Sequence, residues 1–145
     1  PEARLVFPVH LNPSVRATVF ARLAGVPGID LIEPVDYVAM VALLMRARLV
    51  ITDSGGIQEE AAALGRPTLV LRERTERVEG IEAGVARQVG TDPRKIVEKA
   101  LEVLRDRQVW AAMARPTDCY GDGAASARIV AALRAWYGAR GHGGQ

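Results

Sequence analysis

The sequence predicts an α/β fold built on a doubly wound parallel sheet, of the Rossmann-like kind. Short β-rich runs alternate with helical patterns along most of the chain, which is typical of a parallel sheet covered by helices on both faces. In addition, one apolar run stops at Asp53, Gly55 and Gly56 follow, and an amphipathic helix begins at once. We expect one domain over residues 1–137 and a flexible, glycine-rich tail over residues 138–145.

Each element is expected from its own local signal. Short β-rich runs predict strands at residues 4–7, 29–32, 49–52, 68–71 and 86–89. Apolar residues at helical spacing predict helices at residues 13–25, 36–47, 56–64, 92–105, 109–114 and 124–137. Asn12 can cap the first helix, whose first position is Pro13. Gly65 stands in the usual place after the third helix, and Asp92 precedes the fourth.

The composition excludes several classes of function. A net charge of +2 and an aromatic content of 5% give neither the field nor the stacking surface that nucleic-acid binding requires. The single Cys119 excludes an intrachain disulfide and a cysteine zinc site. The longest apolar run, residues 37–45, is too short to cross a bilayer, and no signal peptide is recognisable, so we expect a cytoplasmic location. Because the chain begins at Pro1 without an initiator Met, we expect a piece of a longer protein.

The turn Asp53-Ser54-Gly55-Gly56 is the strongest candidate for a binding site. In a parallel sheet, ligands bind beyond the carboxyl ends of the strands, where this turn lies. Glycines let a ligand approach the backbone, Ser54 offers a hydroxyl, and the first amides of a helix lack intrahelical partners. Such a place suits a phosphate or diphosphate. The turn can equally be a plain tight turn, with Asp53 or Ser54 only capping the helix.

Other motifs that contain these residue types do not fit. The letters Asp-Ser-Gly-Gly also surround the nucleophile of trypsin-like proteases, but those are β-barrels that need a catalytic His and Asp. Only His10 and His142 are present here, and the predicted architecture is α/β. The turn also lacks the Lys of a P-loop and the third glycine of a dinucleotide-binding fingerprint.

Four further residues can take part in binding. Glu60 lies one turn after Gly56 and can accept hydrogen bonds from a ribose diol, or it can be a solvated helix glutamate. Arg74 or Arg77, in the charged loop of residues 72–79, can reach the same phosphates, or this loop can pair with itself. His10, at a strand end, can bind a ligand or act as an acid or base, or it can be a hydrogen-bonded structural histidine.

In combination, these residues resemble the bacterial non-hydrolysing UDP-N-acetylglucosamine 2-epimerases, specifically their C-terminal domain. The matching motifs are Pro8-Val-His-Leu-Asn-Pro13, Thr52-Asp-Ser-Gly-Gly-Ile-Gln-Glu-Glu-Ala61, Leu64-Gly-Arg-Pro67, Thr75-Glu-Arg77 with Glu79, Ala83-Gly84, Val89-Gly-Thr-Asp92 and Tyr120-Gly-Asp-Gly123. They span nearly the whole chain. The resemblance implies the C-terminal half of a two-domain, glycosyltransferase-B-like (GT-B) fold.

The resemblance also implies roles for individual residues. Ser54, Gly55 and Gly56 hold the diphosphate of UDP, Glu60 binds the ribose, and Arg77 helps to bind the UDP-sugar.

Three further residues belong to this implied substrate-binding set. His10 falls near the interdomain region that the family associates with an effector UDP-N-acetylglucosamine. Val35 stands where a Gln is common, and Met40 where an aromatic residue is common. Because the family contacts uracil there through the main chain, Val35 can keep those contacts while losing any side-chain contact.

The implied reaction interconverts UDP-N-acetylglucosamine and UDP-N-acetylmannosamine for cell-envelope polysaccharide biosynthesis. It proceeds by anti-elimination of UDP to a glycal, followed by re-addition. The acidic residues for proton transfer belong to the missing N-terminal domain, so we expect no catalytic residue in this chain and no activity of the chain alone. Neither a metal nor another cofactor is implied. The expected partners are UDP, UDP-N-acetylglucosamine, the N-terminal domain and, in the full-length enzyme, a second subunit of a homodimer, with no nucleic acid and no membrane.

Two other functions remain open at this point. The chain can be the nucleotide-binding half of a related UDP-sugar glycosyltransferase. Glu60 lacks the second Glu eight residues on that such enzymes often carry, because that position is Thr68. Alternatively, the chain can be a module that binds partner proteins, in which the glycine turn is only structural.

Overall fold

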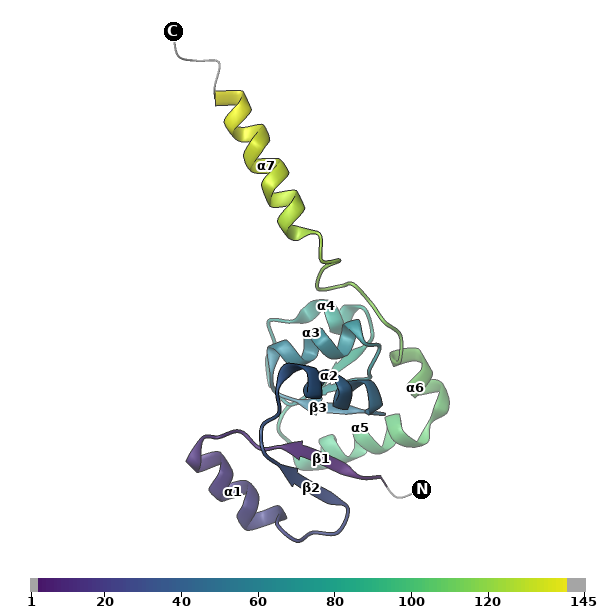
Figure 1. Cartoon of the computed structure of the whole chain (residues 1–145). Coiled ribbons are helices and arrows are strands. Elements are labelled where there is room, and N and C mark those ends of the chain that lie inside the picture. Colours follow the sequence, from purple (N-terminus) through teal and green to yellow (C-terminus); the bar gives the residue numbers. More distant parts are fainter. Residues whose placement is uncertain (1–2, 141–145) are drawn as a thin grey trace. The chain divides into compact units, whose positions relative to one another are not determined.

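The computed structural model describes residues 3–140 of the chain. The chain divides into two compact units, Pro1–Leu43 and Leu44–Gln145, which are described separately (Figure 1). Within the described residues, no helix combines the length and the apolar character that crossing a bilayer needs.

The first unit holds two parallel strands and the helix between them. These elements are β1 (Leu5–Pro8), α1 (Pro13–Leu23) and β2 (Ile29–Ile32), with Leu5 opposite Ile29. The predicted cap is present, since the Asn12 side chain accepts a hydrogen bond of 2.9 Å from the Ser14 amide. The following helix, α2 (Tyr37–Arg46), runs from the first unit into the second, and the Asp36 carboxylate accepts a bond of 2.8 Å from the Ala39 amide at its start.

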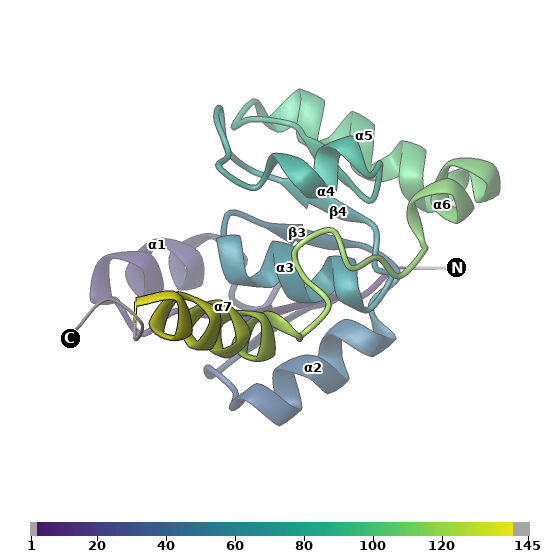
Figure 2. The same cartoon turned by 90° about the horizontal axis from the view of Figure 1, so that it is seen from above.

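The second unit is built around a three-stranded parallel sheet in the order β3-β4-β5. Its elements are β3 (Val50–Thr52), α3 (Gly55–Ala63), β4 (Thr68–Val70), α4 (Val78–Glu82), β5 (Ala86–Gln88), α5 (Pro93–Arg105), α6 (Arg107–Met113) and α7 (Ala125–Arg140). Helices α3 and α5 lie on opposite sides of this sheet, as Figures 1 and 2 show together. The carboxyl ends of β3 and β4 therefore lie next to each other, which brings the start of α3 close to the loop that follows β4.

The core of the second unit comes from the three strands of the sheet, the residues next to them, and helices α3, α5 and α6. Its most deeply buried apolar side chains include Leu69, Val70, Val85, Val89, Val103 and Met113. Gly65, which follows α3, has a φ of +65°, and a Cβ there would lie 2.7 Å from Pro116. Only glycine meets both conditions, so this residue ends the helix as expected and lets residues 115–116 pack against it.

The structure confirms the α/β class and the parallel pairing, with three differences. The strands form two separate sheets, of two and three strands. The short helix α4 was not expected, since its five residues include Gly80 and are too few to give a helical pattern; it begins within the charged loop of residues 72–79. Helix α7 reaches Arg140, three residues beyond the expected end at Tyr137, since one glycine costs a helix only about 1 kcal/mol.

The domain limits stay a prediction, namely one domain over residues 1–137. Residues 138–140, expected to belong to a flexible tail, are part of helix α7, and residues 141–145 lie outside the described part of the chain.

Replacing Val103 by Ala should lower the free energy of unfolding by about 2 kcal/mol, because buried methyl groups are lost and a cavity remains. Val103 is 0% exposed, whereas Val97 on the same helix is 57% exposed. The matched Val97→Ala variant should therefore keep the stability of the parent protein. Urea denaturation followed by circular dichroism measures both, and equal losses at the two positions would contradict the described core.

Candidate functional site

The glycine turn ends in a helix start whose first amides have no partner. Strand β3 stops at Thr52, and the Ser54 side chain accepts a long bond of 3.5 Å from the Ile57 amide. The Ser54 amide is already used, since it donates to the Thr52 hydroxyl at 3.0 Å. Among the described residues, the amides of Gly55 and Gly56 have no hydrogen-bond acceptor. The amides of Gly55 and Gly56 are therefore available to a ligand, and the amide of Ser54 is not.

Two arginines from the loop after β4 lie at this helix start. A Cβ added to Gly55 would be in ordinary van der Waals contact with the Arg77 guanidinium, at 3.4 Å, so this guanidinium lies beside the backbone of the turn. Arg72 donates from Nε to the Asp53 carbonyl oxygen at 2.6 Å. The site therefore combines unpaired amides, the positive end of a helix dipole and two guanidinium groups, which together suit an anion.

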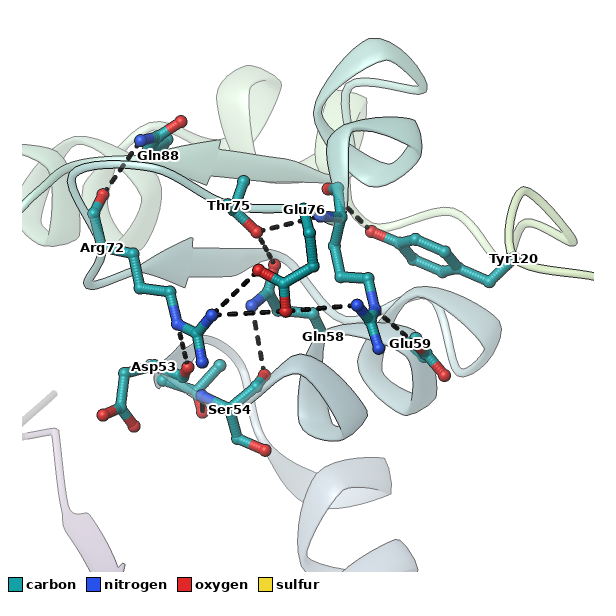
Figure 3. A network of polar contacts seen from close by, with 11 residues as sticks. Asp53, Ser54, Gln58, Glu59, Arg72, Thr75, Glu76, Gln88 and Tyr120 are labelled. Atoms are coloured by element: carbon teal, nitrogen blue, oxygen red, sulfur yellow. Dashed lines mark hydrogen bonds and ion pairs between the residues drawn. The ribbon is translucent and has the colours of Figure 1, made fainter.

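The Glu76 carboxylate bridges the two arginines. It accepts bonds of 3.0 and 3.3 Å from Arg72 Nη1 and of 3.2 Å from Arg77 Nη1. Its own backbone amide and the positive charges of Arg72 and Arg77 hold the pKa of Glu76 below its usual value, against the opposing effect of burial. Arg77 also donates from Nε to the Glu59 carboxylate at 2.5 Å, and this bond is the largest cause of its raised pKa. Figure 3 shows this network of polar contacts from close by.

A buried polar chain ties the loop to the helix. Gln58, only 2% exposed, donates from Nε2 to the Ser54 carbonyl oxygen at 3.2 Å. Its Oε1 accepts from the Thr75 hydroxyl at 3.3 Å, and the same hydroxyl accepts from the Arg77 amide at 3.1 Å. Thr75 and Gln58 thereby connect the backbone of Arg77 to the first turn of α3. Figure 3 shows the Thr75, Gln58 and Ser54 part of this chain.

Tyr120 fixes the other side of the same loop. Its hydroxyl accepts from the Gly80 amide at 3.0 Å and donates to the Arg77 carbonyl oxygen at 3.2 Å. A Cβ on Gly80 would lie less than a hydrogen-bond distance from that hydroxyl, so the close approach requires glycine. Burial is the main cause of the raised pKa of Tyr120, which keeps the hydroxyl protonated and able to donate.

Glu60 has an unsatisfied oxygen. Its Oε2 is buried and has no hydrogen-bond partner among the described residues. A buried acceptor without a donor is unfavourable, so a hydroxyl donor from outside the protein would stabilise it. The residue lies on α3 one turn beyond Gly56.

The remaining expected residues belong to the first unit. His10 is exposed, and its Nδ1 accepts from the Asn12 amide at 3.1 Å, which is the hydrogen-bonded arrangement that the sequence left open. Val35 is half-buried between β2 and α2, and no hydrogen bond of its main chain is found within residues 3–140. Met40 is half-buried on α2. The structure brings Ser54, Gly55, Gly56, Glu60 and Arg77 together in the second unit, and it holds these three residues in the first.

Sequence reasoning missed Arg72, Glu59 and Tyr120 as parts of this network. Arg72 could have been found, because it follows a buried strand by two residues, at the sheet edge where ligands bind. Tyr120 could not, because it reaches Arg77 across 43 positions of sequence. Arg74, the alternative to Arg77, makes no hydrogen bond or ion pair within the described residues. No group of side chains suited to a metal ion is found in the same part of the chain.

Comparison with known proteins gives consistent matches over most of the chain. The model of the UDP-N-acetylglucosamine 2-epimerase family matches residues 1–134. A probable UDP-N-acetylglucosamine 2-epimerase of Ralstonia solanacearum is 50% identical over 94% of this chain, but the match covers 36% of that protein.

Solved structures match in the same way. The structure of S. aureus MnaA with UDP matches with a TM-score of 0.87 and 40% identity, over 93% of this chain and 36% of the other. The UDP-N-acetylglucosamine 2-epimerase of Neisseria meningitidis, bound to UDP-N-acetylglucosamine, matches with a TM-score of 0.86 and 41% identity, over 90% of this chain and 35% of the other. The chain thus spans about a third of the length of the relatives that it matches.

Replacing Tyr120 by Phe should lower the free energy of unfolding by about 1–2 kcal/mol, because the Gly80 amide and the Arg77 carbonyl group both lose a partner. The Tyr37→Phe variant is the control, since Tyr37 is 68% exposed and its hydroxyl makes no hydrogen bond within the described residues. Thermal and urea denaturation measure both variants. Tyr120→Phe as stable as the parent would show that this hydroxyl does not hold the loop.

Proposed function

Because the chain belongs to the UDP-N-acetylglucosamine 2-epimerase family, we propose that it supplies the UDP-binding, C-terminal part of an enzyme that interconverts UDP-N-acetylglucosamine and UDP-N-acetylmannosamine. One observation carries this proposal. The unpaired amides of Gly55 and Gly56 lie at a helix start beside the Arg77 guanidinium, where the diphosphate of UDP can bind.

The diphosphate is bound by main-chain and side-chain donors together. Hydrogen bonds to charged groups contribute about 1.5–3 kcal/mol each, so the amides of Gly55 and Gly56 give a substantial part of the binding free energy. The guanidiniums of Arg77 and Arg72 add charge and direction, because they are anchored to the helix start through Gln58, Thr75 and Asp53. The Ser54 hydroxyl can donate to the same phosphates.

Roles in binding the nucleoside are assigned residue by residue. The buried, unpartnered oxygen of Glu60 supports a role as acceptor from the ribose hydroxyls. The unpaired main chain of Val35 supports contacts with uracil that do not depend on its side chain. Met40, half-buried on α2, is assigned to the same uracil-binding set by the family resemblance. His10 is assigned to the binding of the effector UDP-N-acetylglucosamine, through the ring nitrogen Nε2 that its local bond leaves open.

This part of the enzyme supports the departure of UDP. In the elimination, the C1–O bond of the sugar breaks, its electron pair goes to the diphosphate, and the proton at C2 goes to a base. Helix dipole, amides and guanidiniums stabilise the negative charge that develops on the diphosphate. The bases and acids at C2 are assigned to the part of the enzyme that the chain does not span, so conversion of UDP-N-acetylglucosamine by the chain alone would contradict this assignment.

Partners follow from the same assignment. We place the remaining two thirds of the relatives' length in an N-terminal domain that closes over the nucleotide, and we expect a homodimer of the full-length enzyme. A cytoplasmic location fits nucleotide-sugar chemistry and the single Cys119 of the chain.

UDP should bind to the chain with a dissociation constant between about 1 μM and 1 mM, and Gly56→Asp should weaken this at least tenfold. The new carboxylate puts negative charge where the diphosphate binds. An Asp in the first turn of a helix is itself stabilising, and a Cβ on Gly56 meets no atom within 4 Å, so the variant should stay folded. Isothermal titration calorimetry measures the affinity.

Two controls complete this test. Gly56→Ala adds only the Cβ and should bind UDP nearly as the parent does. Gly138→Asp adds the same charge on α7, where a Cβ also meets no atom, and should leave the affinity unchanged. Unaltered UDP binding by Gly56→Asp would remove the support for a diphosphate at this helix start.

A further inference from the structure

We propose that the Glu76 carboxylate competes with the substrate diphosphate for the guanidiniums of Arg72 and Arg77, and that it must leave them when the diphosphate binds. This inference rests on the function proposed above, and it adds a determinant of affinity that lies in the chain itself. It assigns to Glu76 the role of an internal anion that sets how tightly the site binds phosphate groups.

The Glu76 carboxylate lies beside the helix start and between the two arginines. Glu76 Oε1 would lie 3.5 Å from a Cβ added to Gly55, next to the Arg77 guanidinium at 3.4 Å. Both of its oxygens accept bonds from Arg72, and Oε1 also accepts from Arg77. The carboxylate therefore takes the place that an anion bound by these arginines and by the start of α3 would take (Figure 3).

The positive charges of the two arginines are already balanced by carboxylates of the chain. The guanidiniums of Arg72 and Arg77 face the carboxylates of Glu76 and Glu59, so their positive charge is already matched. A diphosphate added to this arrangement would meet like charge close by, which is unfavourable. A net attraction returns only when a carboxylate moves away.

Of the two carboxylates, that of Glu76 is the one that can move away. Glu59 is on the helix α3 and, within residues 3–140, forms an ion pair only with Arg77. Glu76 is on the loop between β4 and α4, and its side chain is 54% exposed. Its removal from the arginines needs only a change of side-chain rotamer into solvent, and exposed ion pairs of this kind are weak. The loop backbone stays in place, because Thr75 before Glu76 is bonded to Gln58, and Arg77 after it is bonded to Tyr120.

Glu76→Gln tests the competition, because it keeps the shape of the side chain and removes the charge. The variant should bind UDP and inorganic pyrophosphate about three to ten times more tightly than the parent chain, with the same relative gain for both. Uridine, which has no phosphate, should bind equally to the two proteins. Glu82→Gln is the matched control: Glu82 is exposed on α4 and makes no hydrogen bond or ion pair within the described residues, so its loss should change no affinity.

Calorimetric titrations at one ionic strength separate the outcomes, with denaturation midpoints as the check that each variant is folded. Weaker or equal binding of UDP and pyrophosphate by Glu76→Gln, while the parent binds both, would overturn the competition and make Glu76 a residue that positions the arginines. An equal gain in Glu82→Gln would also overturn it, by showing a general effect of charge. If neither the parent nor Glu76→Gln binds UDP, the diphosphate site itself fails, and this inference fails with it.

Discussion

The first turn of a helix cannot satisfy its own amide groups, and the rest of this site depends on that constraint. At the start of α3, Ser54 and Thr52 occupy the neighbouring donors, while Gly55 and Gly56 keep theirs unpaired. The parallel sheet places this helix start beside the loop that follows β4. A short polar network then holds Arg77 beside Gly55, so that a guanidinium lies close to the start of the helix.

This arrangement also explains why the network is rich in paired charges. Neighbouring arginines repel each other when no anion is bound, and the carboxylates of Glu59 and Glu76 offset this repulsion at close range. In the proposed competition, the ion pairs with Glu76 and the binding of a phosphate group oppose each other, because both use the same guanidiniums. The uncharged anchors, Gln58, Thr75 and Tyr120, keep the loop in place whichever anion the arginines hold.

The fold and the centre of the site were predictable from the sequence, because both are local. Strand β2 has the expected bounds, and the turn around Gly55 starts a helix as its residue types indicate. The contact of Tyr120 was not predictable, because it depends on tertiary packing across 43 positions of sequence, whereas Arg72 could have been found from its place just after β4. The helix α4 was missed for the same reason, since its support comes from Tyr120 rather than from its own sequence.

The central claim is that the amides of Gly55 and Gly56 donate to a diphosphate, and amide NMR tests it most directly. UDP added to the ¹⁵N-labelled chain should shift the proton signals of both amides downfield, with saturation at one common dissociation constant, because hydrogen bonds to charged oxygens deshield the amide proton. The amides of Gly121 and Gly123, on the exposed loop before α7, should not move. Shifts that spare Gly55 and Gly56 while other residues of the chain respond would contradict the account.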